Sequence, residues 1–587
     1  MNLETVIVLA GLVILVFLLA REFLRPAIGF FLLAAIFTIT GIITPAEALS
    51  GFANEQIAVV IILMFVADVI KRREILDTVF NAVFSGAKTY RSFLARMMVY
   101  TSGISAFINN TPLVAIMIPQ VSDWSRRHRI APSRLFIPLS YATVLGGLIT
   151  LVGTSTNLVV NGLAMEAGYP SLRIFDFAYV GIPAAVAGLI YIFFIGSRLL
   201  PVKKPVSERF YEQTREYLVE TLVQPGSSLE GKTISDAGLR NLPGLYLVEI
   251  LRHEQKITPV SPDENILPGD ILFFAGEIRT IADLIKKFPG LSLPKTGHLP
   301  FTGKTELIET VVSTNSDLTG KKIRETGFRD KFDASVVAVH RNGERISGKI
   351  GEVVLKAGDL LLVMTGKNFH RLAAGKPDFY LLSKVGEINT EKSASKWLLV
   401  ISLVTALILS STGLLSLFKA LLILVGIIAL LKLVTLNEIR QGIDLNLVAV
   451  LAFSFALSKA MAHSGAAAFI SGTVMDVAKM WGPVGMLAGI YIVTNLLTAF
   501  ITNAAAAAIT LPIAMSIVAT TGLPPMPFIL AVAYAATADF STPFGYQTNL
   551  MVYGPGGYRF TDYVKIGVPL NIIYMIICLA ILGFMYF

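Results

Sequence analysis

Long apolar runs occupy both ends of the chain. Runs such as Leu3–Ala20 approach the length of about 20 residues that a helix needs to cross a bilayer. Between about Pro201 and Lys392 these runs stop, and short β-like runs appear between glycine, proline and charged turns. The predicted strands include Tyr246–Leu251, Ile271–Phe274, Val336–Val339 and Leu360–Met364. The pattern therefore predicts an α-helical polytopic membrane protein with a soluble α+β insert between two membrane regions.

The insert contains an internal repeat with a spacing of 89 residues. Leu229, Gly231, Lys232, Ile234, Gly238, Arg240, Gly269 and Asp270 recur as Leu318, Gly320, Lys321, Ile323, Gly327, Arg329, Gly358 and Asp359. Eight matches without a gap predict two tandem copies of one small domain, over residues 205–290 and 300–385.

The two membrane regions, residues 1–200 and 396–587, also repeat each other. Three groups of residues in the first region recur in the second. The first group is Asn109-Asn110-Thr111 with Pro119, which recurs as Thr502-Asn503-Ala504 with Pro512. The second is Gly153 with Thr156-Asn157, recurring as Gly545 with Thr548-Asn549, and the third is Asp176, Gly181 and Pro183, recurring as Asp562, Gly567 and Pro569. The spacings of 393, 392 and 386 residues drift slightly, as short loop deletions would produce.

Positively charged residues predict the orientation, because cytoplasmic loops are enriched in lysine and arginine. Arg21 and Arg25 follow the first apolar run, residues 71–73 follow the third, and residues 49–56 between the second and third contain neither type. We therefore expect the N-terminus outside a plasma (inner) membrane. The first run starts with an acidic rather than a basic residue and lacks a small-residue cleavage site, so we expect it to remain as a transmembrane helix.

The apolar stretch 97–125 differs from a simple span, because basic residues flank it on both sides, including Arg96 and Arg126. Both ends are therefore expected on the cytoplasmic side, which predicts a re-entrant hairpin. Helices near 135–165 and 177–198 would then return the chain to the cytoplasm before the insert.

Each half thus combines an odd number of crossings with one hairpin, which predicts that the second half is inverted. Its hairpin, residues 484–520, is expected to enter from outside. Inverted repeats with paired broken elements are typical of secondary transporters.

Each hairpin has a polar tip in the middle of an apolar run, at Asn109-Asn110-Thr111 and at Thr502-Asn503-Ala504. Broken backbone at that depth is tolerated only where it lines a protein- or water-filled cavity. We expect the tip side chains to cap free N–H groups of the following helices, whose dipoles present partial positive charge. Behind the tips lie polar breaks at Gly153–Asn157 and Thr542–Asn549, which offer oxygen ligands suited to a small alkali cation.

One Asn-Thr pair in a membrane helix more often makes an interhelical hydrogen bond than a binding site. Four motifs related in pairs favour a site. Neither tip contains lysine or arginine, so helix N-termini, amides and hydroxyls would hold an anion beside bound cations. Asp539 is the one acid near the second break, with ion coupling and a structural capping role equally open.

Composition excludes several classes of protein. Of 587 residues 54% are hydrophobic and 15% charged, against about 25% charged in soluble domains, which excludes a conventional cytosolic enzyme. The single cysteine, Cys578, excludes an intramolecular disulfide and a cysteine-based zinc site. The net charge of +9 arises from basic residues at the ends of apolar runs, with no basic arm interleaved with aromatics, so no nucleic-acid partner is expected.

The sequence lacks the motifs of two other classes of transport protein. No phosphate-binding Gly-x-x-x-x-Gly-Lys-Ser/Thr loop of an ATP-driven pump occurs, nor a Thr-Val-Gly-Tyr-Gly selectivity loop of a potassium channel. The six histidines are scattered, so no enzymatic function is predicted. An alternative function from a different class is a cation pathway that the insert regulates.

Over residues 1–200 and 396–587 the chain resembles the divalent anion/sodium symporter family, whose repeated Ser-Asn-Thr tips and Thr-Pro-Pro-Asn-type breaks correspond to the four motifs. The resemblance implies sodium sites at Ser105, Asn109, Asn110 and Gly153 and at Thr498, Asn503 and Gly545. It implies substrate binding by Asn110, Thr111, Thr156, Asn157, Asn503, Ala504, Thr548 and Asn549. It also implies sodium-coupled symport by an elevator motion within a homodimer.

The sequence departs from the family pattern at three places. The first tip has Asn109 where serine is usual, the second loses a hydroxyl at Ala504, and the two Pro-Pro pairs are replaced by Ser155-Thr156 and Gln547-Thr548. The resemblance implies that the dicarboxylate subgroup of this family grips two carboxylates with two complete tips. The loss of tip hydroxyls therefore favours a compact inorganic dianion such as sulfate. Di- or tricarboxylates and other oxyanions remain alternatives.

The insert resembles tandem TrkA-C (RCK_C) regulator domains of potassium-conductance proteins. Transporters that carry such an insert resemble the algal and cyanobacterial sulfate-permease subgroup, which again favours sulfate. These domains commonly dimerise and sometimes bind small cytosolic ligands. Both an assembly role and gating by such a ligand are open.

Overall fold

The computed structural model describes most of the chain. The described residues are 2–20, 23–24, 26–72, 80, 83–84, 86–203, 218–239, 242, 245–253, 255–257, 260–276, 288–292, 306–313, 316–341, 344–346, 350–366, 368–373, 378–381, 393–430 and 443–587. Arg21, Arg25 and Arg73, which bear on the predicted orientation, and Arg240 of the 89-residue repeat lie outside these residues.

Within its described residues, every regular element of the first membrane region is a helix. Its helices are α1 (Leu3–Ala20), α2 (Pro26–Ile39), α3 (Pro45–Leu49), α4 (Glu55–Arg72), α6 (Tyr90–Ser105), α7 (Asn110–Arg127), α8 (Phe136–Gly147), α9 (Ser155–Glu166), α10 (Ala178–Tyr191) and α11 (Ser197–Leu199), with 3-10 turns at Ser50–Ala53 and Pro132–Arg134 and a π-helical turn at Ile192–Gly196. The apolar run Leu3–Ala20 forms α1 over its whole length.

The second membrane region follows the same pattern. Its helices are α16 (Ser393–Ser411), α17 (Leu417–Leu430), α19 (Leu445–His463), α20 (Ala466–Ala478), α21 (Gly482–Thr498), α22 (Asn503–Thr521), α23 (Pro525–Thr537), α24 (Gln547–Tyr553) and α25 (Phe560–Tyr586), with a 3-10 turn at Lys479–Trp481. Pro512 inside α22 and Pro569 inside α25 repeat Pro119 in α7 and Pro183 in α10.

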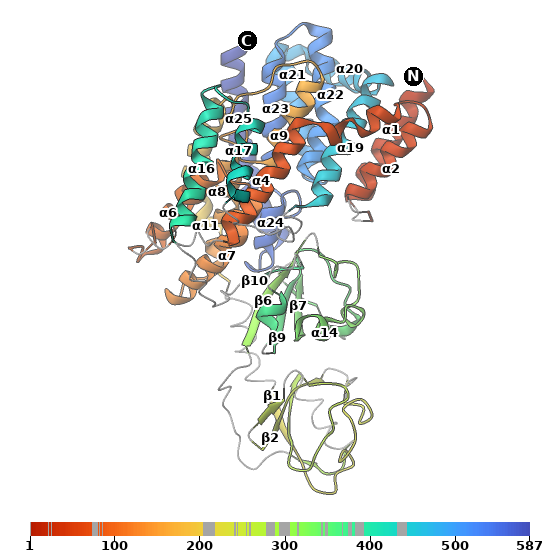
Figure 1. The fold of residues 1–587 in the computed structure, drawn as a ribbon, viewed down its shortest axis with the longest axis vertical. Helices are drawn as coiled ribbons and strands as arrows, with labels where there is room; N and C mark the ends of the chain where they lie inside the picture. Colours follow the sequence, from red (N-terminus) through yellow and green to blue (C-terminus); the bar gives the residue numbers. More distant parts are fainter. Residues whose placement is uncertain are drawn as a thin grey trace.

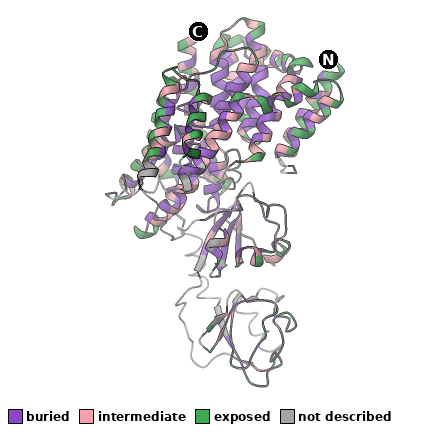
Figure 2. Cartoon of the chain, in the orientation of Figure 1, coloured by how far each residue is buried: buried purple, intermediate pink, exposed green. Residues whose placement is uncertain are grey.

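Several of these helices can cross a membrane. Among the described residues, four are long and apolar enough by themselves, and Pro45–Ala53 with Glu55–Ala67, bent by 41°, adds a broken span. Figure 2 shows buried residues along the inside of the helical bundle and exposed ones around its outside. Many exposed positions are large and apolar, such as Ile39, Phe500 and Phe584, as lipid contact requires. The chain is therefore a multi-pass membrane protein, mostly helical, with a broken span.

The polar tips and breaks interrupt helices where the sequence predicts. Residues 106–109 separate α6 from α7, and residues 499–502 separate α21 from α22. The stretch 135–165 forms two helices, α8 and α9, separated by residues 148–154, and residues 538–546 separate α23 from α24. The broken elements interlock the two regions, because α9 packs against α22 and α23 while α24 packs against α7 and α8.

The insert forms a small antiparallel β region with two five-stranded sheets. The strands are β1 (Leu218–Val223), β2 (Leu245–Arg252), β3 (Gln255–Ile257), β4 (Ile271–Gly276), β5 (Leu291–Ser292), β6 (Glu306–Val312), β7 (Ala334–Arg341), β8 (Glu344–Arg345), β9 (Leu360–Thr365) and β10 (Phe379–Leu381). The strand orders are β3-β2-β4-β1-β5 and β10-β6-β9-β7-β8. Read in reverse, the second order matches the first, with β6–β10 in the places of β1–β5.

The 89-residue spacing recurs in the details of both sheets. The register of β2 on β4 shifts between Leu247 and Glu249, and that of β7 on β9 shifts between Val336 and Ala338. Each sheet also has one arginine paired with a nearly fully buried aspartate. Arg252 binds Asp270 at 2.9 Å and Arg341 binds Asp359 at 2.7 Å. The hydrogen bonds that Arg252 donates to Asp270 raise the pKa of Arg252, which keeps its guanidinium charged.

The sheets lie on one side of the helical bundle (Figure 1). The sheet of β6–β10 is next to the helices, the sheet of β1 and β2 is farther away, and both chain termini lie at the opposite end of the bundle. Each sheet has its own hydrophobic core, the first around Leu239 and Phe274 and the second around Phe332 and Leu361.

Candidate functional site

The first hairpin tip is held by side chains from both membrane regions. Ser105 ends α6 and Asn110 begins α7, and the Ser105 hydroxyl donates to the Asn110 side-chain carbonyl at 2.5 Å. The Asn110 amide donates to the Tyr546 hydroxyl. Next to it, the Thr111 hydroxyl donates to Oε1 of Gln547 at 3.0 Å. The tip of the first half therefore rests on the break of the second.

The second tip repeats the first at the level of single hydrogen bonds. The Thr498 hydroxyl, at the end of α21, lies 3.1 Å from the side-chain carbonyl of Asn503, which begins α22. The same hydroxyl lies 2.7 Å from the backbone carbonyl of Ala536. Thr498 and Asn503 stand 393 residues after Ser105 and Asn110. The two tips share one local geometry.

The expected capping of the tip helices by side chains is wrong. Neither the N-cap of α7, Asn109, nor that of α22, Thr502, makes a side-chain hydrogen bond to its helix. The asparagines that follow are bound to Ser105 and Thr498, the last residues of the preceding helices. The first N–H groups of both tip helices are therefore free of side-chain caps, and they can donate to a bound anion.

The first break gathers oxygen atoms behind the tip. The Asn157 amide donates to the carbonyls of Thr150 at 2.9 Å and Gly147 at 3.5 Å, while its own Oδ1 is buried without a hydrogen-bond partner. Gly153 lies so close to this group that an added Cβ would stand 2.5 Å from the Gly147 carbonyl and 2.8 Å from that of Ser105. Converging carbonyls and an unpaired amide oxygen suit a hard cation such as sodium.

The second break has the same frame with one chemical difference. The Asn549 amide donates to the carbonyls of Asp539 and Thr542, each at 3.0 Å. An added Cβ on Gly545 would stand 2.7 Å from the Thr498 carbonyl, and only 1.7 Å from Oδ2 of Asp539. Where the first break presents the backbone of Gly147, the second therefore presents a carboxylate.

The predicted substrate residues are buried near these breaks. Thr156 and Asn157 lie in the first turn of α9, and Thr548 and Asn549 lie in α24. The second pair is bound across the halves by Ser140 of α8, whose hydroxyl is 2.8 Å from the Thr548 hydroxyl and 2.7 Å from Oδ1 of Asn549.

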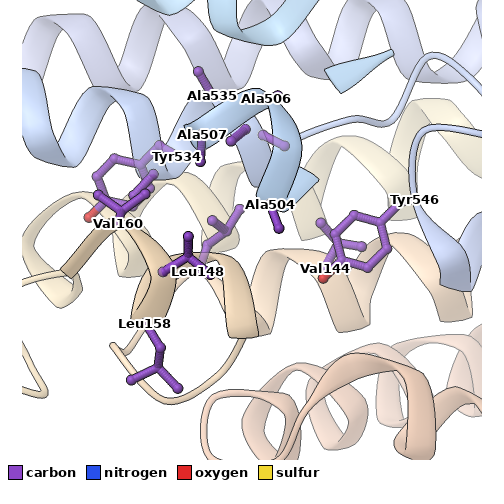
Figure 3. Close-up of a cluster of buried hydrophobic side chains, with 14 of the residues drawn as sticks. Val144, Leu148, Leu158, Val160, Ala504, Ala506, Ala507, Tyr534, Ala535 and Tyr546 are labelled. Atoms are coloured by element: carbon purple, nitrogen blue, oxygen red, sulfur yellow. The ribbon is translucent and has the colours of Figure 1, made fainter. Parts of the chain in front are cut away.

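Ala504 lies in a buried cluster built by both halves. Figure 3 shows it together with Tyr546 and with Val144 of α8. Asn109, in contrast, is half-buried, and its side chain does not cap α7, so its part in the predicted first sodium site stays a prediction.

Sequence reasoning did not single out Ser140 and Tyr546, nor did it assign a role to Thr154 or Gln547. The Tyr546 hydroxyl binds Asn110 and lies 3.3 Å from that of Thr154. Tyr546 and Gln547 do lie inside the predicted polar break 542–549, which was the available signal. Their contacts join residues 436 apart, and no local pattern reports such a distance.

The apolar spans and the polar breaks buried among them define a membrane transporter. The sequence matches the family CitMHS, described as citrate transporter, over residues 13–423 and 406–587. The chain belongs to this family. It is therefore a secondary anion transporter and not an enzyme.

Similar proteins cover nearly the whole chain. It is 34% identical to the "Putative sulfur deprivation response regulator" of Chlamydomonas reinhardtii, over 94% of this chain and 96% of that protein. It is 28% identical to "Uncharacterized transporter YfbS" of Escherichia coli over 100% of both chains. It is 25% identical to "Sodium/sulfate cotransporter 1" of Chlamydomonas reinhardtii, over 95% of this chain and 87% of that protein.

Proposed function

We propose that this chain is a sodium-coupled symporter of a small divalent anion, with sulfate as its substrate. The observation that carries the proposal is a pair of matching oxygen-lined breaks, around Gly153 and Gly545, each placed behind a hairpin tip with uncapped helix N–H groups. The similarity to a protein named as a sodium/sulfate cotransporter over 95% of this chain supports the same substrate and ion.

The proposed architecture is a pair of inverted repeats. Its support is the match between contacts 392 residues apart, with Asn157 on Gly147 and Thr150 in one half and Asn549 on Asp539 and Thr542 in the other. Figure 1 labels α6 and α7 toward the sheets, and α21 and α22 toward the termini. Two hairpins that enter from opposite sides permit alternating access by an elevator motion of the tips and breaks.

The charge of the site explains why cations must accompany the anion. The helices α7, α8, α22, α23 and α24 carry no basic residue near the tips, and the only basic residues among them are Arg126 and Arg127 at the far end of α7. Helix N-termini supply only partial positive charge, equivalent to roughly half an elementary charge each. Sodium in the two breaks supplies the remaining charge next to a dianion. Transport of the anion without sodium is therefore unfavourable.

The size of the site favours sulfate over a dicarboxylate. Tyr546 and Gln547 extend from the second break to Asn110 and Thr111 of the first tip. In the first half the equivalent positions, 392 residues earlier, hold the smaller Thr154 and Ser155. Two large side chains across the first tip leave less room for the second carboxylate of an organic dianion.

The insert is proposed to be a pair of TrkA-C-like domains, over 205–290 and 300–385, on the cytoplasmic side of a plasma (inner) membrane homodimer. Its second sheet touches the site's own scaffold. Val311 and Leu360 are fully buried in the hydrophobic core of the membrane helices, and the carbonyl of Gly358 lies against Gly554 just after α24. Because α24 carries Thr548 and Asn549, a small ligand or assembly contact that moves this sheet would move the site.

The test is uptake of labelled sulfate into proteoliposomes that contain the purified full-length chain. We expect uptake to require an inward sodium gradient and to be inhibited by unlabelled sulfate more strongly than by succinate or citrate. Uptake that is equal with sodium and with choline would contradict sodium coupling. Stronger inhibition by citrate or succinate than by sulfate would instead support a carboxylate transporter.

A second arm tests the site itself. Asn110→Ala and Asn503→Ala remove the two tip asparagines, so both variants are expected to lose coupled uptake while the protein still inserts and purifies normally. Undiminished transport in both variants would show that the tips do not bind the transported species.

A further inference from the structure

The two breaks are related by the repeat, yet they differ in charge. Gly147, Thr150, Gly153 and Asn157 of the first half stand 392 residues before Asp539, Thr542, Gly545 and Asn549 of the second. The two asparagines make the same pair of hydrogen bonds in each half. The frame is conserved between the halves, and a glycine is exchanged for an aspartate.

The Asp539 carboxylate points into the position where a cation would bind. Its Oδ2 lies next to Gly545, close enough that a single added methyl group there would overlap it, and the Thr498 carbonyl faces the same point. The equivalent point in the first half is lined by the Gly147 and Ser105 carbonyls. The second break therefore offers the equivalent backbone oxygen plus a carboxyl group.

The hydrogen bonds around Asp539 are donated to it. Its Oδ1 accepts from the Ser541 backbone N–H at 3.1 Å and from the Ser541 hydroxyl at 3.0 Å, and its Oδ2 accepts from the Thr542 hydroxyl at 2.7 Å. A carboxylate that accepts three hydrogen bonds is stabilised as an acceptor, which is the role of its ionised form.

No basic side chain balances this charge. Asp539 is 1% exposed, and within the described part of the chain it takes part in no ion pair. The neighbouring helices α8, α21, α23 and α24 contain no lysine, arginine or histidine. Two neutral groups face the segment around Asp539: the Tyr141 hydroxyl of α8, which donates to the Phe540 carbonyl, and the Asn571 amide of α25. A buried charge without a partner costs several kcal/mol, roughly, so the ionised carboxylate is stable there only with a cation beside it.

We propose that Asp539 is a direct ligand of the second sodium ion, and that it makes the second cation site the tighter of the two. The carbonyl oxygens at the first site supply only dipoles, whereas the Asp539 carboxylate supplies a charge directly beside Gly545. This inference rests on the proposed sodium coupling and specifies how its two ion sites differ.

The test is direct binding of ²²Na⁺ to the purified full-length protein, with choline chloride keeping the ionic strength constant. Two binding phases are expected for the wild type. Asp539→Asn keeps the size and much of the hydrogen bonding of the side chain but removes its charge, and it should weaken the tighter phase by about tenfold or more. Asp539→Gly, which copies the residue of the first half, should do the same and serves if the first variant does not fold.

Ser105→Ala is the matched control, because it removes a hydroxyl from the first tip and leaves Asp539 untouched. The tighter phase should persist in this variant. If the wild type binds sodium and Asp539→Asn retains its affinity within about twofold, the role of Asp539 is overturned while sodium coupling stands. If neither the wild type nor Ser105→Ala binds sodium, the proposed function itself is contradicted, and the role of Asp539 falls with it.

Discussion

At the scale of single residues, the proposed site depends on two glycines that have no side chain as well as on the polar side chains around them. Gly153 and Gly545 have almost no space for a side chain, because the oxygen atoms of the breaks stand where a Cβ would lie. Glycine at these two positions lets backbone oxygens of the tip and the break approach one another. A cation site made of such oxygens is lost as soon as one carbon atom is added.

Gly545→Ala and Gly153→Ala are therefore expected to abolish sodium-dependent uptake. The added Cβ of the first would stand 1.7 Å from Oδ2 of Asp539, so the carboxylate must move. The measurement is the sodium dependence of sulfate uptake in proteoliposomes. Gly103→Ala is the control, since Gly103 lies in the same hairpin helix as Ser105 with nothing within 4 Å of an added Cβ. Normal sodium dependence in Gly545→Ala would refute the cation site.

Tyr546 is expected to set both affinity and selectivity. Tyr546→Phe removes the hydroxyl that binds Asn110, and losing a buried hydrogen bond of about 1–2 kcal/mol should raise the KM for sulfate roughly 5- to 30-fold. Tyr546→Ala should in addition let succinate compete with sulfate, because it opens space at the first tip. Tyr191→Phe, which loses a 3.0 Å hydrogen bond to the Ile566 carbonyl and none to a hairpin tip, should change neither property. A selectivity unchanged in Tyr546→Ala would show that this side chain does not limit substrate size.

At the scale of elements, the broken helices need internal support, because lipid cannot satisfy their free backbone groups. In each half one asparagine provides it. Asn549 is fully buried, donates to two carbonyls of residues 538–546 and accepts from Ser140 of the other half. The break is thus a defined loop, held to the opposite repeat as well as to its own.

Asn549→Ala should unfold the second break without unfolding the bundle. Each buried polar group left unpaired costs about 1–3 kcal/mol, so the melting temperature should fall by several degrees. The melting temperature should also stop rising when sodium and sulfate are added. Asn161→Ala is the matched control, because Asn161 is another buried asparagine, bound to Ser171 and Leu172 in the first half. It should lower stability but keep the ligand effect; equal ligand effects in both variants would exclude a role for Asn549 at the site.

At the scale of the whole molecule, the insert contacts α24, the helix that carries two residues of the proposed transport site. Gly358, in a turn of the second sheet with φ +83°, lies so close to Leu550 of α24 that an added Cβ would stand 2.5 Å from its Cδ1. Gly269, the equivalent residue of the first sheet, has φ +88° and nothing within 4 Å. The two domains are linked to each other by Arg329, which donates to the Val260 carbonyl.

Gly358→Val is expected to change transport, and Gly269→Val is its control. Both variants place a side chain at a positive φ, so both carry a similar strain of roughly 1–3 kcal/mol. Only Gly358→Val also pushes against α24, so only this variant should alter the rate or the KM of sulfate uptake. Equal uptake by the two variants, both correctly folded, would show that the contact between the sheet and α24 does not affect transport.

The sequence by itself determined the layout of the molecule. Apolar length predicted the membrane helices, and short β-like runs between turns predicted β2, β4, β7 and β9. The 89-residue repeat predicted a spacing that recurs in both sheets. It also predicted where helices break, since Asn110 and Asn503 begin helices at the tips, as expected. These features depend on residues that are neighbours along the chain or on patterns that recur within it, and the linear sequence contains both kinds of information.

Only the tertiary structure decided how the tips and breaks are joined. It replaced the expected side-chain caps with bonds from Ser105 and Thr498, and it placed Tyr546 on Asn110 although the two are 436 residues apart. It also showed the Asp539 carboxylate beside Gly545, where the first half has only the backbone of Gly147. Such contacts depend on the packing of one half against the other, and packing across hundreds of residues leaves no local trace in the order of amino acids.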